Sequence, residues 1–156
     1  MEIFNKTNSR NTGGLKILTS YMLISPKNSL TKNLSIQISL VPVGSGQPIH
    51  AHGPEQCYYV VKGKGLVMIE NETREVSSGD AVYIPSNKKH GIKNIGDEVL
   101  EYLTANSPVF AKEYEDAIWP ADPIRRLPLW EKNDSAYPPR WNSYGRIFKT
   151  AGDQSV

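Results

Sequence analysis

Apolar and polar residues alternate in short runs through the first two thirds of the chain. Between Leu34 and Leu40 every second residue is apolar, which is the pattern of a strand with one buried face. Glycine, proline, asparagine and aspartate separate the runs, and many short strands divided in this way predict an all-β barrel or sandwich. We expect further strands over residues 15–24, 56–62, 66–70, 74–76, 81–84, 90–93 and 98–104.

The runs 56–62 and 66–70 are separated only by Gly63-Lys64-Gly65. A short connection containing glycine between two strand-like runs is typical of a β-hairpin. We therefore expect these two strands to pair with each other.

The composition changes near residue 108, so we expect an N-terminal arm at 1–14, a β-barrel at 15–107 and a C-terminal extension at 108–156. One short helix is expected at 111–119. Beyond it prolines recur among aromatic residues, and all three tryptophans of the chain lie in this extension. Proline density argues against long regular structure, while aromatic content argues against disorder. We expect an irregular arm that packs on the barrel or on a partner subunit, with a pocket lid as the alternative.

A chain of 156 residues with 38% hydrophobic and 22% charged residues is typical of one globular domain. The net charge of +2 and the short basic pairs do not indicate a nucleic-acid partner. No stretch approaches the roughly 20 apolar residues of a membrane helix, and the first residues lack the order of a signal peptide. Cys57 is the only cysteine, so no internal disulfide can form, and we expect a cytoplasmic protein.

All three histidines lie in two short segments that glycines introduce. His50 and His52 are two residues apart on a predicted strand, so their side chains point to the same face. Two imidazoles aimed at one place form half of a transition-metal site. His90, the remaining histidine, is the natural further ligand.

The spacing of these residues resembles the two motifs of the cupin family. The first motif, G-x5-H-x-H followed by E-x6-G, is matched by Gly44, His50, His52, Gln56 and Gly63. The second, G-x5-P-x-G-x2-H-x3-N, is matched by Gly79, Pro85, Asn87, His90 and Asn94. Gln56 stands where the family usually has Glu, and Asn87 replaces a glycine, which is a mild change because Asn tolerates left-handed backbone geometry.

The resemblance implies a jelly-roll barrel that binds one divalent transition metal, which could be Zn, Mn, Fe, Ni or Co. It assigns the ligand positions to His50, His52, Gln56 and His90. Glu55 is a competing carboxylate. Alternation favours Gln56, which shares a face with Tyr58, but the bend at Gly53-Pro54 could shift the register and keeps Glu55 open.

A glutamine ligand coordinates through a neutral amide oxygen, so three imidazoles and an amide leave the ion with its full charge. A more positive centre is a stronger Lewis acid. We therefore expect isomerase, lyase, epimerase or cyclase chemistry on a small oxygenated substrate. An Fe(II)-dependent dioxygenase and a non-catalytic metal-binding or small-molecule-binding protein remain the alternatives.

A Lewis-acid mechanism also needs a group that moves protons. The candidates expected to face inward are Tyr58, Tyr83 and Tyr102, each of which could instead be a core aromatic. Cys57 alternates to the other face from Gln56, and we expect it only to pack. The exposed aromatic residues of the extension and the need to cover edge strands favour a homodimer.

Overall fold

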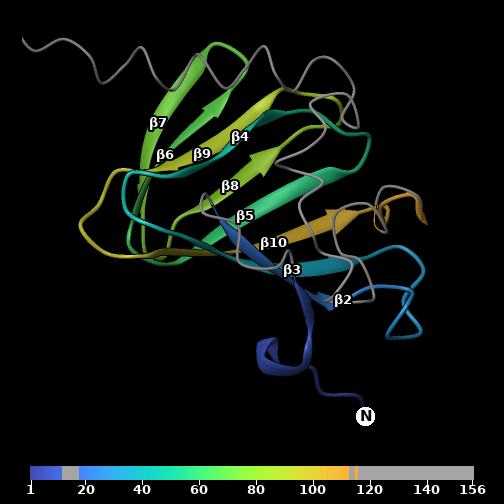
Figure 1. Cartoon of the computed structure of the whole chain (residues 1–156). Coiled ribbons are helices and arrows are strands. Elements are labelled where there is room, and N and C mark those ends of the chain that lie inside the picture. The colour runs from blue at the N-terminus through green and yellow to red at the C-terminus, as the bar shows by residue number, and fades with distance from the viewer. Residues whose placement is uncertain (12–17, 113–114, 116–156) are drawn as a thin grey trace, which may run out of the picture.

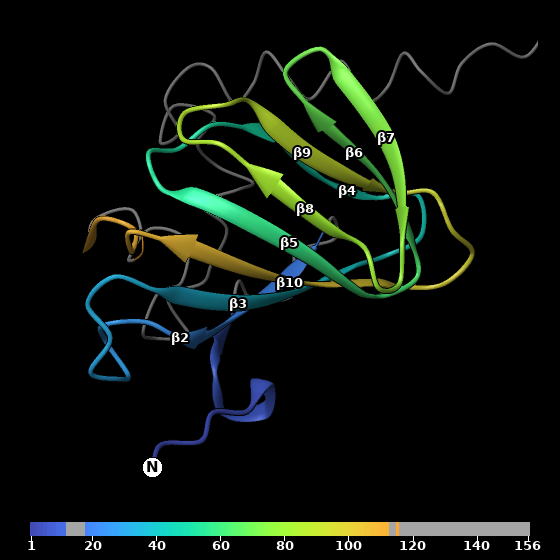
Figure 2. The same cartoon turned by 180° about the vertical axis from the view of Figure 1, so that it is seen from behind.

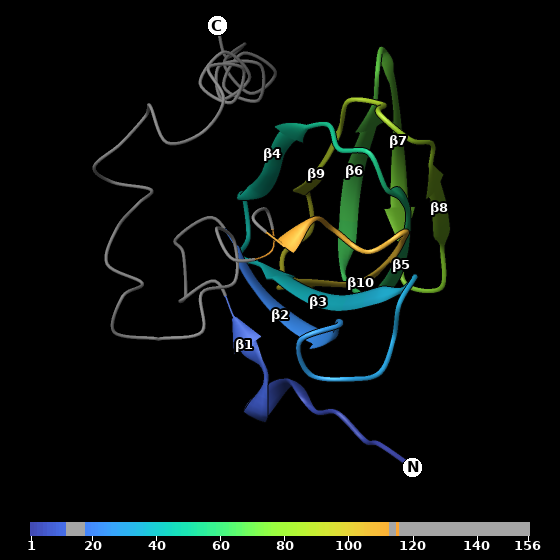
Figure 3. The same ribbon diagram turned by 90° about the vertical axis from the view of Figure 1, so that its right-hand side faces the viewer.

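Two antiparallel sheets face each other in the computed structural model, which describes residues 1–11, 18–112 and 115 (Figure 1). The six-stranded sheet has the order β1 (Arg10–Asn11), β2 (Thr19–Ile24), β3 (Ser35–Val41), β10 (Leu100–Ser107), β5 (Glu55–Lys62) and β8 (Ala81–Ile84). The four-stranded sheet has the order β4 (Gly46–His50), β9 (His90–Asn94), β6 (Lys64–Ile69) and β7 (Glu72–Ser77). A 3-10 turn, η1 (Lys6–Asn8), precedes β1. The predicted all-β barrel is confirmed, and Figure 3 shows its strands surrounding a common interior.

The predicted hairpin between residues 56–62 and 66–70 is wrong. β5 pairs with β10 and β8, whereas β6 pairs with β7 and β9 in the other sheet. Gly63 has a φ of +86°, and a Cβ built there would lie 3.0 Å from the Cα of Leu100. The chain thus turns sharply at a position that only glycine fits, and it crosses from one sheet to the other instead of folding back on itself.

The interior of the barrel is apolar in one half and polar in the other. The apolar half contains Val41, Val60, Ile84, Ile92 and Leu100, all with 0% exposure. The polar half comes from β3, β5 and β10, whose buried residues include Ser35, Gln37, Ser39, Gln56, Thr104 and Asn106. Buried polar side chains are unusual in a protein interior, so this half of the barrel is the candidate location of a functional site.

The first residues of the C-terminal extension pack against the N-terminal arm. Lys112 and Glu115 are helical, and the backbone N–H of Glu115 donates to the carbonyl of Ala111 at 3.0 Å. The buried Glu115 carboxylate forms an ion pair with Arg10 and accepts a 2.9 Å hydrogen bond from the Ser25 hydroxyl. The rest of the helix expected at 111–119, and the proline-rich and aromatic part beyond it, lie outside the described residues. Within the described part of the chain, no helix has the length and apolar character needed to span a membrane.

Candidate metal centre

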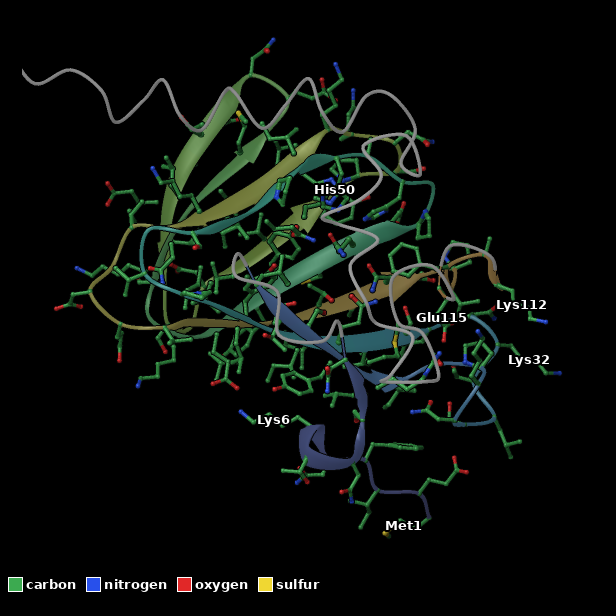
Figure 4. All side chains as sticks on the ribbon, in the orientation of Figure 1. Met1, Lys6, Lys32, His50, Lys112 and Glu115 are labelled. Carbon is green, nitrogen blue, oxygen red and sulfur yellow. The ribbon has the colours of Figure 1, made fainter. Side chains whose placement is uncertain are left out.

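The three histidines converge at one end of the barrel interior. His50 is the last residue of β4 and His90 is the first residue of β9, and these two residues are direct partners in the antiparallel register. His52 lies two residues beyond β4, after a change of register between Gln47 and His50. The candidate ligand atoms of the three rings all lie within 4.8 Å of one another. Figure 4 shows His50 between the two sheets, whereas Lys6, Lys32 and Lys112 point outward.

Backbone hydrogen bonds set the same tautomer in all three rings. The Nδ1 atoms of His50, His52 and His90 lie 2.9, 2.9 and 2.8 Å from the carbonyl oxygens of Pro48, Pro54 and Lys88, respectively. A carbonyl oxygen can only accept, so each Nδ1 carries the proton and each Nε2 keeps its lone pair. The Nε2 atoms of His52 and His90 are buried without a hydrogen-bond partner. Such a second hydrogen bond from Nδ1 is the usual companion of Nε2 metal ligation.

Gln56 presents its amide oxygen in the same region. Its Nε2 donates to Asn106 Oδ1 at 2.6 Å, and the Nδ2 of Asn106 in turn donates to the Ser35 hydroxyl at 3.3 Å. The hydrogen bond to Asn106 fixes the orientation of the Gln56 amide. The Oε1 atom of Gln56 is buried without a hydrogen-bond partner. A buried acceptor without a donor is costly unless something else occupies it, and a cation satisfies both this oxygen and the imidazole lone pairs.

The histidine cluster is electrically neutral near pH 7. Burial lowers the pKa of His50 from 6.5 to about 3, and the nearby His90 ring lowers it further. Burial likewise lowers the pKa of His90 to about 4, with a contribution from His52. Burial also lowers the pKa of His52, although the Pro54 carbonyl, which accepts from its Nδ1, and the nearby Gln56 side chain oppose the change. Neutral imidazoles are the form that binds a metal.

The loop between β8 and β9 holds the segment that carries His52. The backbone N–H of Asn87 donates to the carbonyl of His52 at 2.9 Å, and the Ser86 hydroxyl donates to the carbonyl of Gly53 at 2.5 Å. Asn87 has a φ of +62°, so the expectation that it adopts left-handed geometry in place of glycine is confirmed. The two motif segments therefore support each other through the backbone.

Phe110 adds an apolar wall on one side of the site. Its side chain is buried, and its ring packs edge-on against His52 with 5.0 Å between ring centroids. Phe110 follows β10 and comes shortly before Glu115, which Arg10 and Ser25 anchor. The start of the C-terminal extension thereby contributes to the surroundings of the metal centre.

Two of the three candidate tyrosines face the interior. Tyr58 and Tyr102 are fully buried, and their hydroxyls donate to Gln47 Oε1 at 2.8 and 3.2 Å. Burial raises the pKa of Tyr102 above its ordinary value, so this phenol stays protonated at neutral pH. Tyr58 also lies against the site, with 6.1 Å between its ring centroid and that of His90.

The expectation that Tyr83 faces inward is wrong. Its side chain is 61% exposed, because Tyr83 pairs with Cys57 and both residues belong to the outer face of the sheet. Glu55 is exposed as well and hydrogen-bonds to Tyr83, which places this carboxylate away from the histidine cluster. The bend at Gly53-Pro54 leaves the register unchanged, so Gln56 is the residue that turns inward.

The sequence of residues 37–106 matches the family model of the cupin domain. Residues 37–106 are a cupin domain. A solved RmlC-like cupin from Shewanella frigidimarina is similar in structure, with a TM-score of 0.62 at 18% identity over 73% of this chain and 96% of that chain. The jelly-roll architecture that the resemblance implied is thereby confirmed.

Curated proteins from other organisms are also related to this chain in sequence. Uncharacterized protein MJ1618 of Methanocaldococcus jannaschii is 40% identical over 80 residues, which cover 51% of this chain and 64% of that protein. The oxalate-binding protein of Thermotoga maritima is 31% identical over 64 residues, which cover 40% of this chain and 53% of that protein. The chain thus spans between about half and two thirds of the length of these relatives.

Sequence reasoning missed three residues around the centre, namely Gln47, Asn106 and Phe110. Alternation along β10 contained the signal for Asn106, because it continues the inward series of Tyr102 and Thr104. The predicted strand ended at residue 104 and left Asn106 out. Gln47 and Phe110 gave no local signal, since both reach the site through the folding of distant segments.

Proposed function

We propose that this cupin is an enzyme that binds one divalent metal ion through His50, His52, His90 and Gln56. The observation that carries the proposal is the set of buried acceptors with no donor, namely two imidazole nitrogens and the Gln56 amide oxygen. The three rings share one tautomer, in which each Nε2 carries the lone pair that binds a metal ion. When bound, the ion supplies Lewis-acid polarisation of a substrate carbonyl or hydroxyl oxygen.

We propose isomerisation, elimination or cyclisation of a small oxygenated substrate as the reaction class. All four ligands are neutral, so none reduces the positive charge of the ion or favours a higher oxidation state. One relative is named for binding oxalate, which is a small oxygenated molecule. The protein itself orients the ligand side chains and excludes water from the site. Asn106 holds Gln56, backbone carbonyls hold the imidazoles, and Phe110 covers the side of His52.

Elemental analysis of the purified protein tests the metal centre. We expect one divalent ion per chain in the wild type and almost none in the double variant His50→Ala/His90→Ala, with circular dichroism showing that the fold is kept. Tyr83→Ala is a suitable control because Tyr83 is exposed on the outer face. Full metal content in the double variant would place the ion elsewhere and reject the proposed ligands.

A substrate screen in air and without oxygen tests the reaction class. We expect turnover without oxygen and with zinc, which is redox-silent, as the bound ion. Gln56→Glu should keep the metal while losing turnover by roughly tenfold, which corresponds to about 1.4 kcal/mol of transition-state stabilisation. Stoichiometric consumption of oxygen that zinc abolishes would instead identify a dioxygenase. Ligand binding without any turnover would identify a binding protein.

We further propose that the protein acts as a homodimer. The outer face of the six-stranded sheet carries a cluster of apolar side chains, which is an arrangement that favours association. A two-fold pair is the commonest closed assembly and would cover the same face of both copies.

A further inference from the structure

A buried ion pair joins the N-terminal arm to the start of the C-terminal extension. Arg10 belongs to β1, and its guanidinium contacts the carboxylate of Glu115, which is 105 positions away in the sequence. The Glu115 side chain is only 3% exposed and that of Arg10 is 20% exposed, so salt screens the pair weakly. Removing one partner of a buried ion pair leaves an uncompensated charge, which is strongly unfavourable. The two segments therefore hold each other in place.

Further hydrogen bonds fix Glu115 through both its side chain and its backbone. Ser25 is fully buried, and its hydroxyl donates to the Glu115 carboxylate at 2.9 Å. Asn28 fixes Ser25 in turn, because its Oδ1 accepts from the Ser25 backbone N–H at 2.8 Å. The backbone N–H of Glu115 donates to the carbonyl of Ala111 at 3.0 Å. Ala111 is thereby tied to the turn that directly follows β2.

Phe110, the neighbour of Ala111, is the point at which this network meets the metal centre. Its side chain is 7% exposed, and its ring lies edge-on to His52 with an interplanar angle of 88°. His50 and His90 are strand residues, whereas His52 lies in the irregular segment beyond β4. The Nε2 atom of His52 is nevertheless buried. Side-chain packing, rather than a strand, must therefore shield this ligand, and the Phe110 ring packs directly against it.

We propose that Arg10 is a positioning residue that acts through Glu115 to hold the Phe110 ring over His52. The N-terminal arm then determines how well the metal centre is closed to water and to competing ligands, because the apolar surroundings of a metal site control solvent access. The inference rests on the proposed metal centre and adds residues from outside it. Arg10, Phe110 and Glu115 all lie outside residues 37–106, which match the cupin family model.

Release of zinc from the zinc-loaded full-length protein to an excess of chelator is the first test. Arg10→Met removes the guanidinium and keeps an apolar stem of similar length. We expect this variant to release zinc at least roughly tenfold faster than the wild type, because Phe110 is no longer held over His52. Phe110→Ala removes the ring itself and should accelerate release by at least as much. Urea denaturation shows that each variant is folded under the conditions of the measurement.

Modification of His52 in the metal-free full-length protein is a second readout, and it does not depend on any ion. Diethyl pyrocarbonate acylates accessible imidazole nitrogens, and mass spectrometry identifies the modified histidine. We expect Arg10→Met and Phe110→Ala to raise the modification rate of His52 by at least roughly fivefold, since this rate follows the population of locally opened molecules.

A double variant separates positioning from a general structural contribution. If Arg10 acts through Phe110, Arg10→Met/Phe110→Ala should behave like Phe110→Ala alone, whereas independent effects would multiply. Arg10→Lys keeps the positive charge and should restore part of the protection. Lys6→Met is the matched control, because Lys6 lies on the same arm and pairs with Glu101 at 3.2 Å. Figure 4 shows Lys6 far from His50, and this control should change neither rate.

Two results would overturn the inference, namely wild-type rates in Arg10→Met, or a double variant in which the two effects multiply. Either result, obtained on protein with zinc bound at full occupancy, leaves the proposed metal centre in place. A wild-type protein that binds no zinc rejects the proposed function instead, and elemental analysis identifies that case. The modification of His52 still tests the positioning by Arg10 there, because it is measured without metal.

Discussion

The side chain of Asn106 decides which atom of Gln56 faces the metal centre. Its Oδ1 accepts from Gln56 Nε2 at 2.6 Å, so only the amide oxygen of Gln56 can point toward the histidines. We predict that Asn106→Leu weakens metal affinity by about 10- to 100-fold, the usual cost of losing a group that orients a ligand. Competition with a fluorescent zinc chelator measures the change.

Ser35→Ala is the control for this prediction. It removes the hydroxyl that contacts Asn106 on the side away from Gln56 and leaves the bond between Asn106 and Gln56 in place. We expect a change in metal affinity of less than about threefold in this variant. Equal losses in both variants would show that general packing, rather than the orientation of Gln56, sets the affinity.

Tyr102 gives a pH dependence with a clear sign. Its burial raises the folded-state pKa above the ordinary value of 10.0, so the folded protein holds this proton more tightly than the unfolded chain does. The resulting stability is fully present below pH 10 and is lost as the pH rises further. We predict that Tyr102→Phe reduces the alkaline loss of unfolding free energy, measured by urea denaturation across this range. The variant should remain stable at neutral pH, because Tyr58 still donates to Gln47. An unchanged alkaline slope would contradict the prediction.

Individual site residues could be predicted from the sequence where a local pattern, such as motif spacing or strand alternation, indicated them. The spacing of His50, His52 and His90 was sufficient to predict that they meet, and alternation correctly favoured Gln56 over Glu55 for the inner face. Alternation could not say which face of the strand from Leu34 to Leu40 is inner, and there the polar side chains, including Gln37, turn inward. Gln37 therefore had no signal in the sequence.

At the level of elements, strand positions were predicted well and their pairing less well. Residues 81–84 were predicted as a strand and form β8 without any shift of its ends. The connection through Gly63 suggested a hairpin, yet it crosses between sheets, because local turn residues do not determine which distant strand supplies the hydrogen bonds. The pairing of β5 with β10 joins residues between 39 (Lys62 and Glu101) and 52 (Glu55 and Ser107) positions apart, and no local pattern records such a pairing.

The close approach of β4 to β9 is the element-level feature that positions His50 beside His90. A Cβ at Gly46 would lie 2.7 Å from the carbonyl oxygen of Ile92, which is backbone and cannot rotate away. We predict that Gly46→Ala destabilises the protein by about 1–3 kcal/mol, the usual cost of overpacking, and also weakens metal binding because β4 must shift. Urea denaturation and chelator competition measure the two effects.

Gly53→Ala is the matched control on the same segment. A Cβ at Gly53 meets nothing within 4 Å, so we expect a stability change within about 0.5 kcal/mol. A Gly46→Ala protein as stable as Gly53→Ala, with normal metal affinity, would show that the two strands have room to separate without cost.

On the scale of the whole molecule, the six-stranded sheet carries apolar side chains on its outer face as well as in the apolar half of its interior. Figures 1 and 2 show the strands of this sheet from opposite sides, and its outer face includes the exposed side chains of Tyr59, Val61 and Tyr83. The strand register aligns Tyr21, Ile38, Leu103 and Tyr59 in one outer row and Ile36, Ala105, Cys57 and Tyr83 in the next. These two rows leave apolar surface on the outside of the sheet, and we propose that a second copy of the chain covers it.

We predict a dimer in sedimentation at micromolar concentration, formed through this outer face. Ile38→Glu places a charge in the middle of the first row and should raise the dimer dissociation constant by at least roughly 100-fold, because a buried unpaired charge is strongly unfavourable. Metal content should be unchanged, since Ile38 points away from the interior. Leu30→Glu makes the same substitution at an apolar residue that is 89% exposed in the loop between β2 and β3, and it should leave the dimer intact. A monomeric wild type, or equal dissociation in both variants, would contradict the prediction and would indicate that another part of the same chain covers this face.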